Sequence, residues 1–253
     1  MTVLIDEVVA GIYRIEVPLP KNPLKYINAY LVKTAERCLL VDTALDRPEC
    51  LEALRNGLSK LHVDMNTTDL FITHMHADHS GLAGVLKTVN RRAFASSQDG
   101  YTINHFGREH WDHLADCAKH HGFDINLLEA AITRHPGYRG GNKAMIDFTI
   151  VRDGDVLDYG DFRFTCVHAP GHTAGHMCLY EANRRILFAG DNILNDITPN
   201  ITAWRDHENP LADYHTSLSK LEQLEIDLVL PAHRTQIADW RARVVELRRH
   251  HEQ

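Results

Sequence analysis

Hydrophobic residues in the first hundred positions alternate between strand-like and helix-like spacing. Short apolar runs rich in branched side chains predict strands over residues 12–17, 29–32, 37–41 and 70–73. Leucines spaced three and four residues apart after Pro48 predict a helix, and residues 81–89 carry a second apolar face at helical spacing. This succession of strands and helices is typical of an α/β protein.

The second half of the chain repeats the strand-rich pattern. Apolar runs separated by glycine, proline or asparagine predict strands over residues 155–157, 162–168, 177–180, 185–189 and 227–230. Leucine spacing predicts a helix over residues 211–224, and an arginine-rich helix is expected over residues 238–251. We expect residues 1–253 to form a single domain.

The middle segment, residues 100–145, is different because it is rich in polar and aromatic residues and lacks strand alternation. Helices are predicted over residues 111–121 and 126–134, and Pro-Gly and Gly-Gly pairs end the segment. We interpret it as a helical insertion beside the active site. An ordinary pair of connecting helices fits the pattern equally well.

Composition narrows the class of protein. Hydrophobic residues make up 44% of the 253 positions, as in a soluble globular protein. The net charge of -7 argues against a nucleic-acid partner, which would require clustered lysine and arginine. Five cysteines without a C-x-x-C pair predict reduced thiols in a cytoplasmic protein. We expect no signal peptide and no membrane partner, because neither a leader pattern nor a long apolar stretch occurs.

Four metal-ligand side chains fall within six residues: His74, His76, Asp78 and His79. Imidazole and carboxylate are natural ligands of borderline divalent metals such as zinc. The cluster follows one predicted strand and precedes a helix, so we expect it at the carboxyl end of that strand, where α/β folds place their sites. A lone histidine would more often be a packing residue, whereas this density predicts a metal site.

Three later motifs each place one histidine or aspartate just past a predicted strand: Pro-Gly-His172-Thr, Gly-Asp191-Asn and Pro-Ala-His233. Each is weak alone, because Gly-His and Gly-Asp pairs are common in turns. Their shared position and their order make the set specific.

With Asp42 in Leu-Val-Asp-Thr, these motifs resemble those of the metallo-β-lactamase superfamily, in order and over almost the whole chain. The resemblance implies an α/β fold, a four-layer αβ/βα sandwich, with the helical insertion near residues 100–145. It implies that one metal is held by His74, His76 and His172, and the other by Asp78, His79 and His233. Asp191 would bridge both metals, and Asp42 would support the site.

Histidine at both of the ligand positions His76 and His172 makes the chain similar to the glyoxalase-II-like branch of the superfamily, including its uncharacterised bacterial members. The short segment between Asp191 and His233 leaves no room for the domain found there in RNA-cleaving members. Members of this branch usually continue further, so we expect a short or missing C-terminal element. The implied activity is hydrolysis of a small-molecule thioester or ester by a hydroxide bridging two divalent metals, most simply zinc, with iron or manganese as alternatives. Asp78 would orient the hydroxide and carry a proton.

Several alternatives stay open. A mononuclear iron persulfide dioxygenase would use the positions of His74, His172 and Asp191, although the complete second ligand set favours two metals. A lactonase would carry a tyrosine where this chain has Leu194, and a phosphodiesterase fits the acidic charge poorly. A structural zinc site, or a binding protein without catalysis, would be a closed set of four ligands rather than seven.

Substrate contacts are less clearly indicated, although a small-molecule substrate is expected and a homodimer is left open. Loop residues expected near the strand ends are Tyr26, Asn28, Tyr101, His105, Trp204 and Arg234. Four arginines could hold an anionic thiol carrier such as glutathione, although a solvated helix face is the favoured interpretation: Arg241, Arg243, Arg248 and Arg249.

Overall fold

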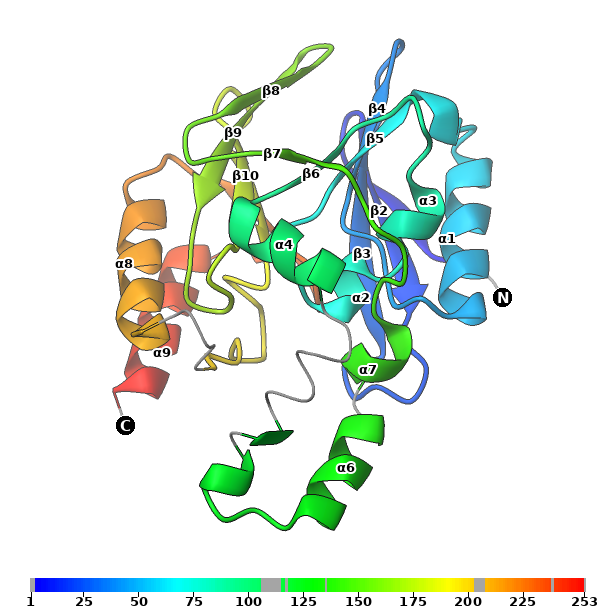
Figure 1. The fold of residues 1–253 in the computed structure, drawn as a ribbon. Helices are drawn as coiled ribbons and strands as arrows, with labels where there is room; N and C mark the ends of the chain where they lie inside the picture. The colour runs from blue at the N-terminus through cyan, green and yellow to red at the C-terminus, as the bar shows by residue number, and fades with distance from the viewer. Residues whose placement is uncertain are drawn as a thin grey trace.

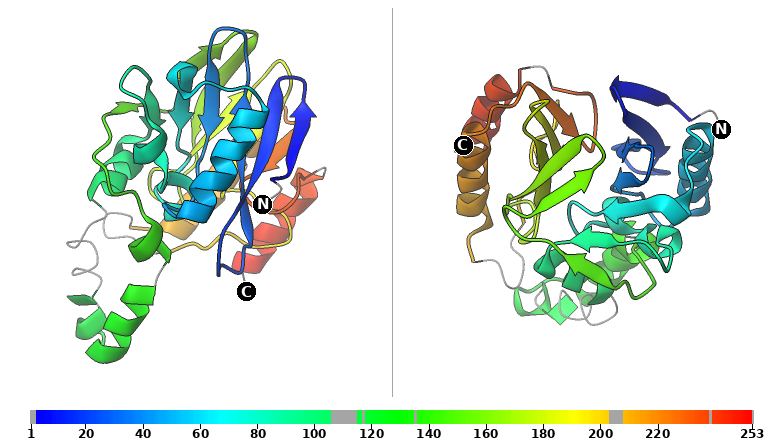
Figure 2. Two further views of the ribbon diagram at one scale, coloured as in Figure 1. Left: turned by 90° about the vertical axis from the view of Figure 1, so that its right-hand side faces the viewer. Right: turned by 90° about the horizontal axis from the view of Figure 1, so that it is seen from above.

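Two β-sheets packed face to face form the centre of the molecule (Figures 1 and 2). The computed structural model describes residues 3–105, 115–116, 118–134, 136–202, 208–237 and 239–252. The seven-stranded sheet contains, in spatial order, β1 (Ile5–Val9), β2 (Ile12–Pro18), β3 (Tyr26–Val32), β4 (Cys38–Val41), β5 (Thr68–Phe71), β6 (Ala93–Ala95) and β7 (Phe148–Ile150). The five-stranded sheet has the order β12 (Leu228–Pro231), β11 (Ile186–Gly190), β10 (Met177–Glu181), β9 (Phe162–His168) and β8 (Val156–Tyr159).

Both sheets are mixed. Strands β1 to β4 pair antiparallel, and β4 to β7 pair parallel. In the other sheet only β11 and β12 are parallel. Parallel neighbours place their carboxyl ends at the same edge, which gathers the loops that follow them.

Helices cover the outer face of each sheet. Helix α1 (Pro48–Lys60) packs on the first sheet, and its close approach to β2 depends on Gly57, where a Cβ atom would lie 2.6 Å from Ile15 Cγ2. Helices α8 (Pro210–Glu222) and α9 (Trp240–His251) cover the second sheet (Figure 2). The four-layer αβ/βα sandwich predicted from the motifs is therefore confirmed.

The layer between the sheets is aromatic. The ring centroid of Phe188 lies 5.7 Å from that of Phe164 and 5.4 Å from that of Tyr30, so the contact joins both sheets. Full burial of such a side chain stabilises the fold by about 1.5–3 kcal/mol. This apolar packing holds the two sheets together.

The predicted and observed elements differ at a few places. Within the helix predicted over residues 81–89 only a single turn forms, α3 (Ala83–Leu86), which ends where Lys87 is extended. Another single turn, α2 (Ala77–Ser80), precedes it. Strands β1, β6 and β7 and the 3-10 turn η1 (Met65–Thr67) were not predicted from the pattern. Helix α9 begins at Trp240, where the Asp239 side chain caps it.

The described residues of the middle segment include three helices. Helices α4 (Ser97–His105), α6 (Ile125–Arg134) and α7 (Pro136–Gly140) belong to it, and α6 lies away from the two sheets (Figure 1). Helix α6 confirms the helix predicted over residues 126–134. The helix predicted over residues 111–121 lies largely outside the described residues, and α4 was not predicted.

Candidate metal centre

The predicted ligands come from loops that follow strands of both sheets. The histidine cluster follows β5, His172 follows β9, and Asp191 and His233 follow the parallel pair β11 and β12. The two sheets meet here, because the Met177 amide donates to the Thr73 carbonyl at 2.8 Å. The structure thereby brings all seven predicted residues together at one edge of the sandwich.

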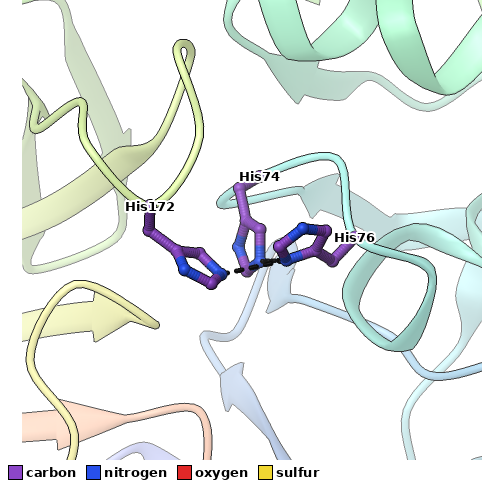
Figure 3. A group of neighbouring side chains, drawn as sticks. All are labelled: His74, His76 and His172. Carbon is purple, nitrogen blue, oxygen red and sulfur yellow. Dashed lines mark hydrogen bonds between the residues drawn. The ribbon is translucent and has the colours of Figure 1, made fainter. Parts of the chain in front are cut away.

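Three imidazoles form a first cluster, His74, His76 and His172 (Figure 3). His76 Nδ1 lies 3.0 Å from His74 Nε2 and 2.9 Å from His172 Nε2. Imidazole nitrogens are natural zinc ligands, and these three atoms lie close enough together to share one metal ion. We call this group the first cluster.

A second cluster joins Asp78, His79 and His233. Asp78 and His79 lie on the single turn α2, so they belong to a helix rather than to the preceding loop. His233 Nε2 lies 3.4 Å from Asp78 Oδ2. The second cluster therefore combines one carboxylate with two imidazoles.

Asp191 stands between the two clusters. Its Oδ1 atom lies 3.5 Å from both His79 Nε2 and His233 Nε2, while its Oδ2 atom lies 3.5 Å from His172 Nε2. Each carboxylate oxygen thus faces one cluster. This is the arrangement of a bridging ligand.

The outward nitrogen of four histidines is hydrogen-bonded, which fixes the ring and its tautomer. Backbone carbonyls accept from His172 Nδ1 at 2.7 Å and from His233 Nδ1 at 3.0 Å. His79 Nδ1 donates to Asp42 at 2.8 Å. The Thr73 hydroxyl donates to Asp42, so it accepts from His74 Nδ1 at 3.0 Å. In the neutral form of each ring, the Nε2 atom then presents a lone pair to the centre, as in metal-binding histidines.

Three inward-facing atoms are buried without a hydrogen-bond partner among the described residues: His79 Nε2, Asp191 Oδ1 and His233 Nε2. An unsatisfied buried polar atom costs about 1–3 kcal/mol. Metal coordination would satisfy all three. The donor set and these atoms fit a binuclear metal site, which the paired His/Asp clusters also indicate.

The electrostatics of the clusters also favour cations. Burial lowers the pKa of His76 to about 3 and that of His74 well below its ordinary value, so both are neutral, the form that binds metal. Burial alone would lower the pKa of His79, but the carboxylates of Asp191, Asp42 and Asp78 raise it well above its ordinary value. The second cluster therefore attracts positive charge, as a proton or as a metal ion.

Asp42 occupies the supporting position that the resemblance implied. It is buried, has the left-handed φ of 60° that aspartate tolerates better than most residues, and accepts from the Thr73 amide at 2.8 Å. Because it also accepts from His79, it joins the loop after β4 to both ends of the histidine cluster.

Sequence reasoning missed two buried residues, His176 and Asp99. His176 Nε2 accepts from the Asp191 amide at 3.2 Å, and its ring stacks on His74 with centroids 5.1 Å apart. Its signal was the second histidine of Gly-His-Thr-Ala-Gly-His. Asp99 accepts hydrogen bonds from two loops of the site, and burial raises its pKa to about 6. It follows β6, a strand too short to be recognised from its pattern.

The residues predicted to contact substrate have varied positions. Asn28 is buried and donates to the carbonyls of Pro231 and Arg234, so its side chain joins β3 to the loop after β12. Tyr26 supports His233 through its carbonyl, and Arg234 has a left-handed φ of 68°. Tyr101 and His105 are exposed and stack on each other on α4. Trp204 lies outside the described residues.

Three of the four helix arginines bind protein groups. Arg241 donates to the Glu222 carbonyl and Arg248 to its carboxylate, which joins α9 to α8. Arg243 donates to the carbonyls of Leu194 and Ile197 and so holds the loop after Asp191. These contacts argue against a carrier site on this helix. Arg241 is nevertheless exposed, as the favoured solvated face predicts, whereas Arg243 and Arg248 are partly buried. Arg249 is exposed.

Comparisons with known proteins agree with this geometry. The family model described as "Metallo-beta-lactamase superfamily" matches residues 22–233. The human acyl-coenzyme A thioesterase MBLAC2 is 27% identical over 223 residues, covering 81% of this chain and 72% of that protein. The atrochrysone carboxyl ACP thioesterase AgnL7 of Paecilomyces divaricatus is 25% identical over 214 residues, covering 84% of this chain and 52% of that protein.

Solved structures show the same likeness. A metallo-beta-lactamase family protein from Thermus thermophilus superposes with a TM-score of 0.85 at 29% identity, covering 97% of this chain and 80% of that one. Among the described residues, no helix is both long and apolar enough to cross a membrane. The family model spans the β3-to-His233 region that builds both clusters, and the chain belongs to the metallo-beta-lactamase superfamily.

Proposed function

We propose that this chain is a metal-dependent hydrolase that cleaves a thioester of a small acyl compound. The observation that carries the proposal is Asp191, whose two carboxylate oxygens face different clusters of metal-ligand side chains. That arrangement supports two metal ions. The choice of thioester is supported by relatives named as acyl-coenzyme A and ACP thioesterases.

The first cluster would hold one ion, the second cluster the other, and Asp191 both. Two divalent ions in such a site, most simply zinc with iron or manganese as alternatives, supply a hydroxide nucleophile at neutral pH and polarise a carbonyl group. Burial would raise the pKa of Asp78, but the neighbouring His79 and His233 lower it. Asp78 is therefore ionised, and we propose that it orients the attacking water and accepts its proton, the role that the resemblance implies.

A cysteine nucleophile is disfavoured by the environment of the described thiols. Cys38, Cys50, Cys166 and Cys178 are buried and form no disulfide. Burial raises the pKa of Cys166 and of Cys178 to about 12, which suppresses the thiolate form that attacks carbonyl groups. This supports a nucleophile derived from water.

The finer assignments are also proposals. The ligand pattern supports the glyoxalase-II-like branch, and buried Leu194 stands where a lactonase would carry a tyrosine. The complete second cluster favours two metals over a single iron. The acidic net charge favours a small-molecule substrate over nucleic acid.

The test is metal content measured together with a substrate panel. Zinc-loaded protein would be given short- and long-chain acyl-coenzyme A, a glutathione thioester, the matched oxygen ester, a lactone and bis-nitrophenyl phosphate. We expect two metals per chain and thioester cleavage about tenfold or more faster than phosphodiester cleavage, a difference of at least about 1.4 kcal/mol in activation free energy.

Other outcomes would redirect the assignment. The protein as purified, before zinc loading, would also be given a persulfide. One iron per chain with oxygen uptake on that persulfide would overturn hydrolysis in favour of a dioxygenase. Faster cleavage of the phosphodiester or the lactone would overturn the thioester assignment while keeping the binuclear site. A protein with two metals that cleaves none of the panel would contradict the proposed substrate class.

A further inference from the structure

A buried carboxylate outside the two clusters links the loops that carry the first one. Asp99 lies in the first turn of α4 with 2% of its surface exposed. Its Oδ2 atom accepts from the Met75 amide at 3.0 Å and from the Thr173 hydroxyl at 2.6 Å. Its Oδ1 atom accepts from the Gly175 amide at 3.0 Å.

The positions of these donors are informative. Met75 lies between His74 and His76, and Thr173 directly follows His172. His76 and His172 belong to different loops, yet their ring nitrogens lie 2.9 Å apart. The distance between these loops therefore decides whether the three imidazoles converge, and Asp99 is hydrogen-bonded to both loops.

The backbone around Asp99 is shaped for this contact. A Cβ atom on Gly175 would lie 2.6 Å from Asp99 Oδ1 and 2.2 Å from Ser96 Oγ, so only glycine permits the approach. The Ser96 hydroxyl also accepts from the Asp99 amide at 3.2 Å, which holds the start of α4. Burial of a carboxylate is costly without such partners.

We propose that Asp99 is a positioning residue that sets the separation of the His74–His76 loop and the His172 loop, and thereby the metal affinity of the first cluster. The second cluster has different supports, since Asp42 orients His79 and the Tyr26 carbonyl orients His233. Loss of Asp99 should therefore weaken one metal site and spare the other. The inference rests on the proposed binding of two metals.

The experiment is zinc titration against a chromophoric chelator with wild-type protein and Asp99→Asn. The variants His76→Ala and His233→Ala assign the two binding events to the first and second clusters. We expect Asp99→Asn to weaken zinc binding at the first cluster by about 10- to 100-fold, the usual effect of removing a group that orients ligands, with the second event unchanged.

Asp69→Asn is the matched control. Asp69 is as buried as Asp99, and it accepts from Tyr159 at 2.6 Å and from the Arg92 amide at 2.9 Å rather than from the ligand loops. It should lower stability and leave both zinc affinities unchanged. Unchanged zinc affinities in Asp99→Asn, or an equal loss at both clusters, would overturn the positioning role.

Two further variants keep the test decisive if Asp99→Asn does not fold. Thr173→Val removes one hydrogen bond to Asp99 and should weaken the first event by about 2- to 10-fold. Gly175→Ala should displace Asp99 sterically and weaken the same event. Wild-type affinity in both folded variants would overturn the inference. A wild-type protein that binds no metal at the first cluster would instead contradict the proposed function.

Discussion

The two clusters of the candidate centre differ in how charge is arranged around them. The first contains three imidazoles. The outward nitrogen of His74 is hydrogen-bonded to a hydroxyl and that of His172 to a backbone carbonyl, and burial lowers the pKa of all three rings. The second contains Asp78 and has Asp42 behind His79, and these carboxylates counter the effect of burial. Asp191 is shared. The comparison teaches that two neighbouring metals would meet unequal environments built from similar ligands.

The largest effect should follow removal of the shared ligand. Asp191→Ala is expected to release metal from both clusters and to reduce hydrolysis by at least about 100-fold, because even groups that only orient ligands contribute 10- to 100-fold. Metal analysis and steady-state rates measure this. The control Asp158→Ala changes an exposed carboxylate paired with Arg163 and should have no effect. Survival of activity would show that Asp191 does not bridge the clusters.

Selective loss of one metal would test the comparison directly. His76→Ala should empty only the first cluster and His233→Ala only the second, because each residue contributes to one group of ligand atoms. Metal-to-protein ratios near one for both variants are expected. If either substitution released both metals, the two clusters would have to be treated as one cooperative site.

The two clusters should also lose their metal ions at different pH values. The pKa values of His79 and His233 are raised, whereas those of His74, His76 and His172 are lowered. A raised pKa means that protons compete with metal already near neutrality, so the second cluster should lose its ion first as pH falls. Metal content after dialysis at stepwise lower pH measures the order. Release from the first cluster before the second would contradict it.

A smaller effect is expected from the contact that places His233. Asn28→Ala removes hydrogen bonds of 3.0 and 2.9 Å to the Pro231 and Arg234 carbonyls, and should lower the free energy of unfolding by about 1–3 kcal/mol. Denaturant unfolding of the metal-free protein measures this. The zinc affinity of the first cluster should stay unchanged. The zinc affinity of the second cluster should fall, because Asn28 holds the loop that carries His233. A loss of stability with an unchanged zinc affinity at the second cluster would show that Asn28 only joins the two sheets.

The middle segment, residues 100–145, is the region whose structure is least predictable from its sequence pattern. Helix α6 was predicted from the sequence, but α4 was not, because its first turn, Ser-Gln-Asp-Gly, is polar and contains a glycine. Its role depends on long-range contacts: Asp99 reaches the first cluster's loops, while α7 packs against α2, which carries Asp78 and His79. Local periodicity cannot report contacts of this kind.

The sequence by itself determined the donor set, its order and the fold. Ligand-type side chains placed just after strands can be recognised one at a time, and the family motifs join them into His74 to His233. The tertiary structure decided which atoms meet: that Asp191 faces both clusters, that His176 and Asp99 support the site, and that the arginines of α9 join it to α8 and to the loop after Asp191. The physical reason is the separation along the chain between the residues that interact. Motifs depend on neighbours along the chain, whereas burial and hydrogen bonding between loops exist only once the two sheets have packed.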